Sequence, residues 1–183
     1  QRCDAALTGF EYMSAASTQL LAAHLPDIAR HGQQITGEQG SDSVLIEISH
    51  PESESAATAM LQEVIGKALD QGIAQDAVIA QSIAQAAQLW KIREEITMAA
   101  AADGPHIKHD IALPVSRLDE FIAAMDRELL ARYAGLRIIN FGHFGDGNLH
   151  YNIAPPLPAG ADASHADSRR ASYTKFLSTQ EDG

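Results

Sequence analysis

The sequence predicts an α+β domain built on a largely antiparallel sheet, with helices packed on one face of that sheet. Three observations lead to this fold class. Strand-like and helix-like segments alternate along the chain before a final pair of strands, the connections between them are short, and each helix is only about four turns long. This pattern favours ferredoxin-like split βαβ units. A parallel doubly wound sheet is the alternative, and it is disfavoured because no glycine-rich phosphate loop follows any strand.

Four elements are expected in the first half of the chain. They are a strand at 10–13, a helix at 14–25, a strand at 43–49 and a helix at 54–71. Ser14 leads the first helix, which stops near Pro26 because proline cannot continue a helix. Gly72 ends the second helix as a C-cap. Between the first helix and the second strand, residues 31–42 are expected to form a polar, glycine-containing loop.

The second half is expected to contain a weaker strand, two helices with a strand between them, and a final hairpin. These lie at 77–80 (strand), 82–101 (helix), 106–115 (strand), from 116 onward (helix) and at 136–153 (hairpin). Ser116 would cap the last helix, with Asp119 in the capping-box position. Apolar residues recur with helical spacing along that helix, namely Leu118, Phe121, Ile122, Met125 and Leu129. Past the hairpin, a Pro/Gly/Ala linker at 155–164 leads into a polar helical segment at 166–178.

The segment from Gly142 to His150, Gly-His-Phe-Gly-Asp-Gly-Asn-Leu-His, is the most informative part of the chain. Its Asp-Gly pair at 146–147 is a strong signal for a two-residue type I′ hairpin, because both central positions of that turn need positive φ. In that register His143 pairs with His150, and directly opposed side chains share one face, with Cβ atoms roughly 4.5–5.5 Å apart. Asn148 points to the same face as His150, because side chains alternate along a strand.

Two neighbouring imidazoles can bind one metal ion. A catalytic zinc ion usually has three protein ligands and one open position, so a third ligand would have to come from elsewhere. The alternative is an ordinary solvated pair of histidines on a surface hairpin. The sequence therefore offers His143 and His150 as candidate metal ligands without completing the site.

A second cluster lies on the helix at 82–101. Trp90, Arg93 and Thr97 fall on one stripe, and the last two are i, i+4 neighbours whose guanidinium and hydroxyl groups can address one ligand. A guanidinium presents a planar donor fork that fits a carboxylate bidentately. The alternative for Arg93 is a surface ion pair with Glu94, with Glu95 or with a residue on another turn.

The strand at 106–115 adds a further cation, Lys108. Alternation places His106, Lys108 and Asp110 on one face of that strand. Such a polar face either meets solvent or lines a pocket. In a pocket, the lysine would add positive charge for a carboxylate ligand.

The chain is acidic, with 13 Lys and Arg against 24 Asp and Glu and a formal net charge of −11. This balance argues against nucleic acid as a partner, because phosphate binding needs a basic face. No apolar run approaches the ~20 residues that cross a bilayer, so no transmembrane segment is predicted. The single cysteine, Cys3, excludes an internal disulfide and fits a reducing compartment. A cytoplasmic location is expected, with peripheral attachment to a membrane left open.

Four separated stretches together resemble one family. They are 10–13 (Phe-Glu-Tyr-Met), 89–97 (Leu-Trp-Lys-Ile-Arg-Glu-Glu-Ile-Thr), 108–114 (Lys-His-Asp-Ile-Ala-Leu-Pro) and 142–150. In this order and spacing the chain resembles the C-terminal, substrate-binding cap domain of FAD-linked oxidases of the vanillyl-alcohol oxidase superfamily. The branch that it resembles contains the D-2-hydroxyglutarate, D-lactate and glycolate dehydrogenases.

The resemblance implies how a substrate would be held. Arg93 and Thr97 would bind the carboxylate of a small 2-hydroxy acid, assisted by Lys108. Asn148 would contact the substrate near the flavin. The acid would be oxidised to the 2-oxo acid as the C2 hydride passes to FAD, and the electrons would then leave to a separate acceptor that the sequence does not identify.

The resemblance also implies a metal site. His143 and His150 would be two ligands of a divalent metal ion, and zinc best fits nitrogen and oxygen ligands. The metal would bind the 2-hydroxyl of the substrate and lower its pKa as a Lewis acid.

Two parts of the family pattern are missing from the sequence. Relatives carry an N-terminal FAD-binding domain with a pyrophosphate loop, and a downstream Glu-His-Gly segment that supplies the third metal ligand and the general base. Residues 1–183 are therefore interpreted as a partial C-terminal domain, with FAD bound mainly elsewhere in a parent enzyme. No catalytic residue is assigned within the chain, and alone it is expected to be inactive.

Two other interpretations stay open. A free-standing α+β sensor module would bind metal at the hairpin and the carboxylate of an effector at Arg93 and Lys108, tightly and without further sequence. A structural or interaction module would use the exposed flavin-side face to form a homodimer. That third interpretation predicts concentration-dependent association without affinity for a ligand.

Overall fold

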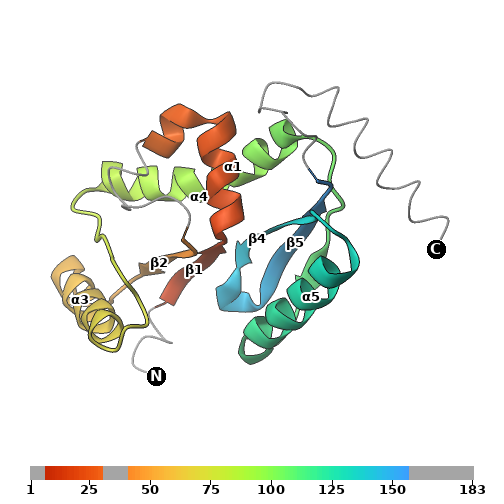
Figure 1. Cartoon of the computed structure of the whole chain (residues 1–183). Helices are drawn as coiled ribbons and strands as arrows, with labels where there is room; N and C mark the ends of the chain where they lie inside the picture. The colour runs from red at the N-terminus through yellow and green to blue at the C-terminus, as the bar shows by residue number, and fades with distance from the viewer. Residues whose placement is uncertain (1–6, 31–40, 157–183) are drawn as a thin grey trace.

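The computed structural model describes residues 7–30 and 41–156, and its strands and helices are mixed along the chain, with α3 and α4 following each other directly (Figure 1). In chain order they are β1 (Leu7–Met13), α1 (Ala15–His24), β2 (Ser43–Ile48), α3 (Glu54–Asp70), α4 (Ile83–Asp103), β3 (Asp110–Ala112), the 3₁₀ turn η1 (Val115–Arg117), α5 (Leu118–Arg132), β4 (Arg137–His143), the 3₁₀ turn η2 (Phe144–Asp146) and β5 (Asn148–Ala154). Cys3, most of the expected loop at 31–42, nearly all of the linker at 155–164 and the expected helical segment at 166–178 lie outside the described residues.

The five strands form one sheet in the order β2-β1-β4-β5-β3. Every neighbouring pair is antiparallel. Since β3 and β4 both run antiparallel to β5, they run parallel to each other with β5 inserted between them, and α5 connects them. This is a split βαβ unit. The predicted α+β class and its antiparallel sheet are confirmed.

Helices cover both faces of this sheet, which corrects the expectation that they pack on one face. The first hydrophobic cluster joins α1 and α4 to alternate residues of β4 and β5, including Ile139, Phe141 and Ala154. The second joins α5 to the opposite residues of the same strands, including Ile138 and Tyr151. Strands that are apolar on both sides expose a hydrophobic surface unless both sides are covered, so the second layer is needed.

The α1/α4 side holds the larger cluster of buried residues. Helix α1 packs on α4 and on β4, and the small side chains of Ala99 and Ala100 are buried in the cluster. Ser14 caps α1 as predicted, since its hydroxyl accepts from the backbone N–H of Ser17. At the far end of α4, the buried carboxylate of Asp103 accepts from the guanidinium of Arg137 at the start of β4, with a donor–acceptor distance of 2.8 Å. These contacts hold α4 against the sheet both in its middle and at its C-terminal end.

The α5 side is largely apolar, and its polar groups include the buried amide of Asn140, which lies opposite Tyr151, and two tyrosine hydroxyls. The Tyr151 hydroxyl donates to Asp126 at 2.6 Å, and the Tyr12 hydroxyl donates to Asp42 at 2.8 Å. Burial raises the pKa of both phenols above the ordinary value, and the two hydrogen-bonded carboxylates raise it further. Tyr12 also stacks on Phe144 of η2, so this side of the sheet supports the end of the hairpin.

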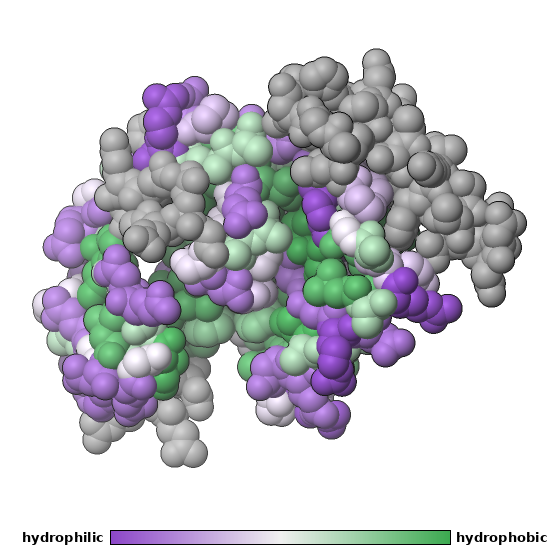
Figure 2. Space-filling view, viewed as in Figure 1, coloured by the Kyte–Doolittle hydropathy of each residue, from purple (hydrophilic) through white to green (hydrophobic). Residues whose placement is uncertain are grey.

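Helix α3 stands apart from both layers. None of its residues is buried, and Val64 and Leu69 are exposed. Figure 2 shows hydrophobic residues gathered at the surface over this helix. Among the described residues, no helix is long and apolar enough to cross a membrane.

Three local predictions are wrong. Residues 77–80 form no strand, because a short apolar run does not by itself distinguish a strand from an irregular segment. The strand at 106–115 shrinks to β3 and one isolated bridge between Ile107 and Ile153. Ser116 does not cap α5, since η1 leads directly into that helix and Arg117 occupies the cap position without a side-chain hydrogen bond.

Candidate functional site

The hairpin between β4 and β5 turns through four residues, not two. Phe141 lies opposite His150, so the predicted pairing of His143 with His150 is wrong. Residues 144–146 form η2, and Gly147 alone takes up the left-handed conformation, with φ of 81°. A type I′ turn would also need positive φ at Asp146, and no described residue other than glycine has it.

The two histidines nevertheless lie on one face of the sheet. The register differs from the predicted one by two residues, and side chains alternate with a period of two, so a shift of two preserves the face. His143 and His150 are therefore diagonal neighbours, with ring centroids 6.2 Å apart and planes inclined at 68°. Phe141 has its side chain on the same face as the two histidines, and it belongs to the first hydrophobic cluster. This face is therefore the one that α1 and α4 cover.

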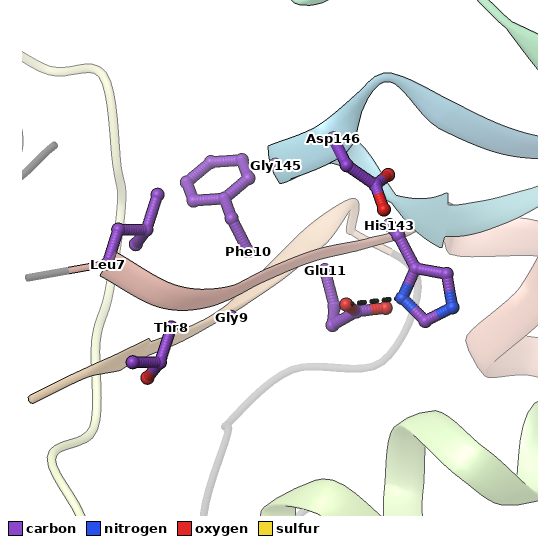
Figure 3. Close-up of a pocket in the computed structure, with 8 residues that line it drawn as sticks. All are labelled: Leu7, Thr8, Gly9, Phe10, Glu11, His143, Gly145 and Asp146. Atoms are coloured by element: carbon purple, nitrogen blue, oxygen red, sulfur yellow. Dashed lines mark hydrogen bonds and ion pairs between the residues drawn. The ribbon is translucent and has the colours of Figure 1, made fainter. Parts of the chain in front are cut away.

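Glu11 of β1 holds the first histidine. β1 pairs with β4 so that Glu11 lies opposite His143, and Oε1 of Glu11 accepts from Nδ1 of His143 at 2.7 Å. Figure 3 shows this contact, with the second ring nitrogen on the side of the ring away from the carboxylate. The Glu11 side chain is only 4% exposed, whereas that of His143 is 53% exposed. A buried carboxylate thus orients an imidazole whose ring reaches solvent.

Asp110 of β3 holds the second histidine in the same way. It lies opposite His150 in the sheet, and its Oδ1 accepts from Nδ1 of His150 at 2.6 Å. Here the carboxylate is exposed and the imidazole is partly buried. In both pairs the carboxylate can only accept, so Nδ1 donates and the lone pair of a neutral ring lies on Nε2.

Paired in this way, the histidines have the tautomer that metal ligands need. Ligating histidines usually donate their other ring N–H to a carboxylate or carbonyl, which fixes ring orientation. Two rings that share one zinc ion, with Zn–N bonds of about 2.0–2.1 Å, have centres roughly 5–6 Å apart, close to the separation seen here. Within the described residues there is, however, no group of three or more His, Cys, Asp or Glu side chains suited to a metal ion. The donor chemistry fits a metal, and the ligand set is incomplete.

Arg93 reaches the same carboxylate from the helix above. Its Nε donates to Oε2 of Glu11 at 2.8 Å, and its side chain is 7% exposed. The guanidinium carbon lies 5.1 Å from the centre of the Phe141 ring. Arg93 therefore forms a buried ion pair with a residue of β1, and not the surface pair with Glu94, Glu95 or a residue on another turn that the sequence offered as the alternative. No hydrogen bond within the described part of the chain uses the two terminal guanidinium nitrogens, so they are available to an anion.

The other predicted substrate residues lie around this centre. Thr97 is exposed one turn further along α4. Lys108 is also exposed, and the register of the Ile107 bridge and of β3 places it on the same face as His150. Asn148 begins β5, and its Oδ1 is buried without a hydrogen-bond partner among the described atoms. An orphaned buried oxygen costs free energy unless a ligand or water meets it.

A cavity of about 220 Å³ opens beside His143. Its lining residues are Leu7 to Glu11 of β1, together with Gly145 and Asp146 of the turn (Figure 3). The Glu11 carboxylate contacts the imidazole, and Asp146 lines the same cavity. The histidine is therefore reached from a recess beside the hairpin.

The sequence alone assigns no role to Glu11 or Asp110. Glu11 interrupts the apolar strand Phe-Glu-Tyr-Met, and a charged residue between large apolar ones is buried only when it is paired. That interruption is the signal that was available. Its partners lie 132 and 82 positions away, so no local pattern names them.

Comparison with known proteins identifies the family. The sequence model for "FAD linked oxidases, C-terminal domain" matches residues 2–172. The chain is 44% identical over 88 residues, or 48% of its length, to a D-2-hydroxyglutarate dehydrogenase of Xanthomonas citri pv. viticola. It is 33% identical over 149 residues, or 81% of its length, to the mitochondrial D-2-hydroxyglutarate dehydrogenase of Arabidopsis thaliana. The corresponding mitochondrial protein of Rattus norvegicus is 32% identical over 149 residues, or 80% of the chain.

The matched regions make up 18%, 25% and 26% of those three relatives, so the chain spans about a quarter of their length or less. The family match extends over nearly the whole chain, and the predicted resemblance is confirmed. The chain belongs to the family of FAD-linked oxidase C-terminal domains.

Proposed function

We propose that this chain is the substrate-binding part of an FAD-dependent D-2-hydroxyacid dehydrogenase, which oxidises a D-2-hydroxy acid to the 2-oxo acid. The observation that carries the proposal is the convergence of Arg93, His143 and His150 on one face of the sheet, two of them joined by Glu11. Relatives named D-2-hydroxyglutarate dehydrogenase support the substrate class. Bound FAD, held mainly by another part of the enzyme, would supply the hydride acceptor.

A substrate with two carboxylates suits the cations on this face. The terminal nitrogens of Arg93 would bind one carboxylate, with the Thr97 hydroxyl one helical turn away. Lys108 is exposed on the same side of the sheet and would attract the other carboxylate. In a chain with a net charge of −11, these cations would focus positive potential where an acidic molecule must bind. D-2-hydroxyglutarate is accordingly the first substrate to test, ahead of D-lactate and glycolate.

A divalent metal, with zinc as the best chemical match, would be held by His143 and His150 and by a third ligand from outside the described residues. When bound, it would supply Lewis-acid stabilisation of the substrate's 2-hydroxylate. The chain's own contribution is orientation. Glu11 and Asp110 fix the two rings, and the buried Oδ1 of Asn148 faces the same side of the sheet as a polar contact for the bound acid.

The decisive experiment follows flavin absorbance in the enzyme that contains this chain, under anaerobic conditions, while D- and L-2-hydroxy acids are added. We expect one D-acid to bleach the flavin and its L-enantiomer to have no effect. Bleaching should disappear after chelation and return on addition of Zn²⁺. A bound flavin that no 2-hydroxy acid reduces would contradict the proposed substrate class, and bleaching that resists chelation would contradict the metal.

Replacement of either histidine tests the site directly. His143→Ala and His150→Ala should abolish turnover while thermal unfolding stays cooperative, because neither ring belongs to a hydrophobic cluster. His109→Ala is a matched control on the neighbouring strand region, since its Nδ1 contacts a backbone carbonyl and not a carboxylate. Near-normal turnover in either site variant would remove the assignment.

A further inference from the structure

Glu11 occupies an unusual position between two candidate functional groups. It is a buried carboxylate in the middle of the sheet, and it uses a different oxygen for each partner. Oε1 accepts from the imidazole of His143, and Oε2 accepts from the guanidinium of Arg93. Three elements, β1, β4 and α4, therefore meet at one side chain.

Asp110 provides the contrast within the same site. It also accepts from a candidate metal ligand, His150, but it contacts no group assigned to the substrate, and its side chain is 74% exposed. The two carboxylates thus differ in one respect that can be tested. Each one orients a histidine, and only Glu11 also orients the arginine.

We propose that Glu11 is a positioning residue that assembles the metal-binding and carboxylate-binding groups as one unit. The inference rests on the proposed function and deepens it. With Nε bonded to Glu11 and the plane held near Phe141, the guanidinium of Arg93 presents its terminal nitrogens in a fixed direction. The same carboxylate fixes the tautomer and angle of His143. One carboxylate therefore orients both the imidazole of His143 and the guanidinium of Arg93.

Glutamine cannot replace Glu11, although it has the same shape. Both neighbours are donors, the Nδ1–H of His143 and the Nε–H of Arg93. The amide has one accepting oxygen, and its nitrogen is itself a donor, so one neighbour must face another donor. Aspartate keeps both accepting oxygens but is one methylene shorter, so it reaches the two partners less well.

The test uses the flavin-containing enzyme with Glu11→Gln, Asp110→Asn and a control, Glu47→Gln. Glu47 of β2 also ties a strand to α4, through the indole N–H of Trp90 at 2.6 Å, but it contacts neither His143 nor Arg93. Two quantities are measured: the dissociation constant of Zn²⁺, by competition with a chromophoric chelator, and KM for D-2-hydroxyglutarate at saturating Zn²⁺. The first needs no turnover.

Glu11→Gln should weaken zinc binding about 10–100-fold, the usual effect of removing a carboxylate behind a ligating histidine. It should also raise KM at saturating zinc by about tenfold or more, because Arg93 is no longer held. Asp110→Asn should weaken zinc binding and leave that KM unchanged. Glu47→Gln should change neither quantity. Glu11→Asp should give intermediate values for both, and it carries the test if the glutamine variant does not fold.

The outcomes separate the two proposals. Normal zinc affinity in Glu11→Gln, or a KM that recovers fully once zinc is saturating, overturns the role of Glu11 and leaves the proposed function intact. An equal rise of KM in Asp110→Asn also overturns it, since Asp110 does not contact the arginine. Absence of zinc binding in the unaltered enzyme overturns the metal proposal together with this inference.

Discussion

The two faces of the five-stranded sheet are built from the same strands but differ in the side chains that they bury. The α5 face is packed mainly with apolar and aromatic side chains, and its polar groups are uncharged: the buried amide of Asn140 and tyrosine hydroxyls that donate to carboxylates at the margin. The α1/α4 face is equally apolar around Ile139 but becomes charged where Glu11 and Arg93 meet above Phe141. The α5 layer thus contributes hydrophobic packing to the sheet. The α1/α4 layer contributes packing too, but part of its area is taken by the buried Glu11–Arg93 ion pair.

The largest expected effect comes from breaking the charged contact. Arg93→Met leaves the Glu11 carboxylate buried without its cation, so the free energy of unfolding should fall by about 3–5 kcal/mol. Glu11→Leu combined with Arg93→Met removes both charges and should recover much of that loss, although the site is destroyed. Urea unfolding of both variants measures the difference. If the double variant is less stable than Arg93→Met, the buried unpaired carboxylate does not account for the lower free energy of unfolding.

A somewhat smaller effect is expected on the opposite face. Leu118 is 1% exposed in the cluster under α5, so Leu118→Ala should lower the free energy of unfolding by about 2–5 kcal/mol through lost burial and a residual cavity. Zinc affinity should not change, because none of the proposed site residues belongs to the hydrophobic cluster described under α5. Chelator competition beside urea unfolding checks both statements. A tenfold change in zinc affinity would show that the two faces are coupled.

The smallest effect concerns the margin of the α5 face. The pKa of Tyr151 is raised in the folded state, so its neutral form contributes stability that is fully present below the unfolded pKa of about 10 and is lost as pH rises through the folded pKa. Tyr151→Phe should cost roughly 1 kcal/mol at pH 8 and should flatten the decline of stability above pH 10. Unfolding curves between pH 8 and pH 11 test this. An unchanged alkaline decline would assign it to other groups, Tyr12 first.

Helices with strong local signals were predictable from the sequence. The helix expected at 82–101 is α4, at 83–103, because Ser82 caps it and no glycine or proline interrupts it. The helix expected at 54–71 is α3, which Ser53 caps. Both signals lie within a few residues of the helix that they define, so tertiary contacts are not needed to find them.

The hairpin shows what a local signal leaves open. Asp-Gly suits a type I′ turn, but it equally suits a 3₁₀ turn that ends in a left-handed glycine, and the second is what forms. The prediction that His143, Asn148 and His150 share one face is still correct, because the observed register differs from the predicted one by two residues. The placement of these three side chains on one face was therefore predictable, while their direct pairing was not.

The charged centre was beyond prediction for a different reason. Glu11 meets its partners only because β1 lies beside β4 and α4 crosses above them. Nothing in the sequence around position 11 states which strand will be its neighbour. The fold places the predicted histidines and Asn148 on a common side of the sheet.

The insertion of β5 between β3 and β4 has a consequence for folding during synthesis. Among the strands of the described ranges, β3 pairs with β5 alone, so it lacks that partner until residues 148–154 emerge. Before then α5 also lacks the side chains of Leu149 and Tyr151 beneath it. Contacts between distant parts of a chain form late because loop closure must come first. The second histidine thus arrives with the strand that completes the sheet, and a nascent chain cannot hold an ion between both rings before its fold is finished.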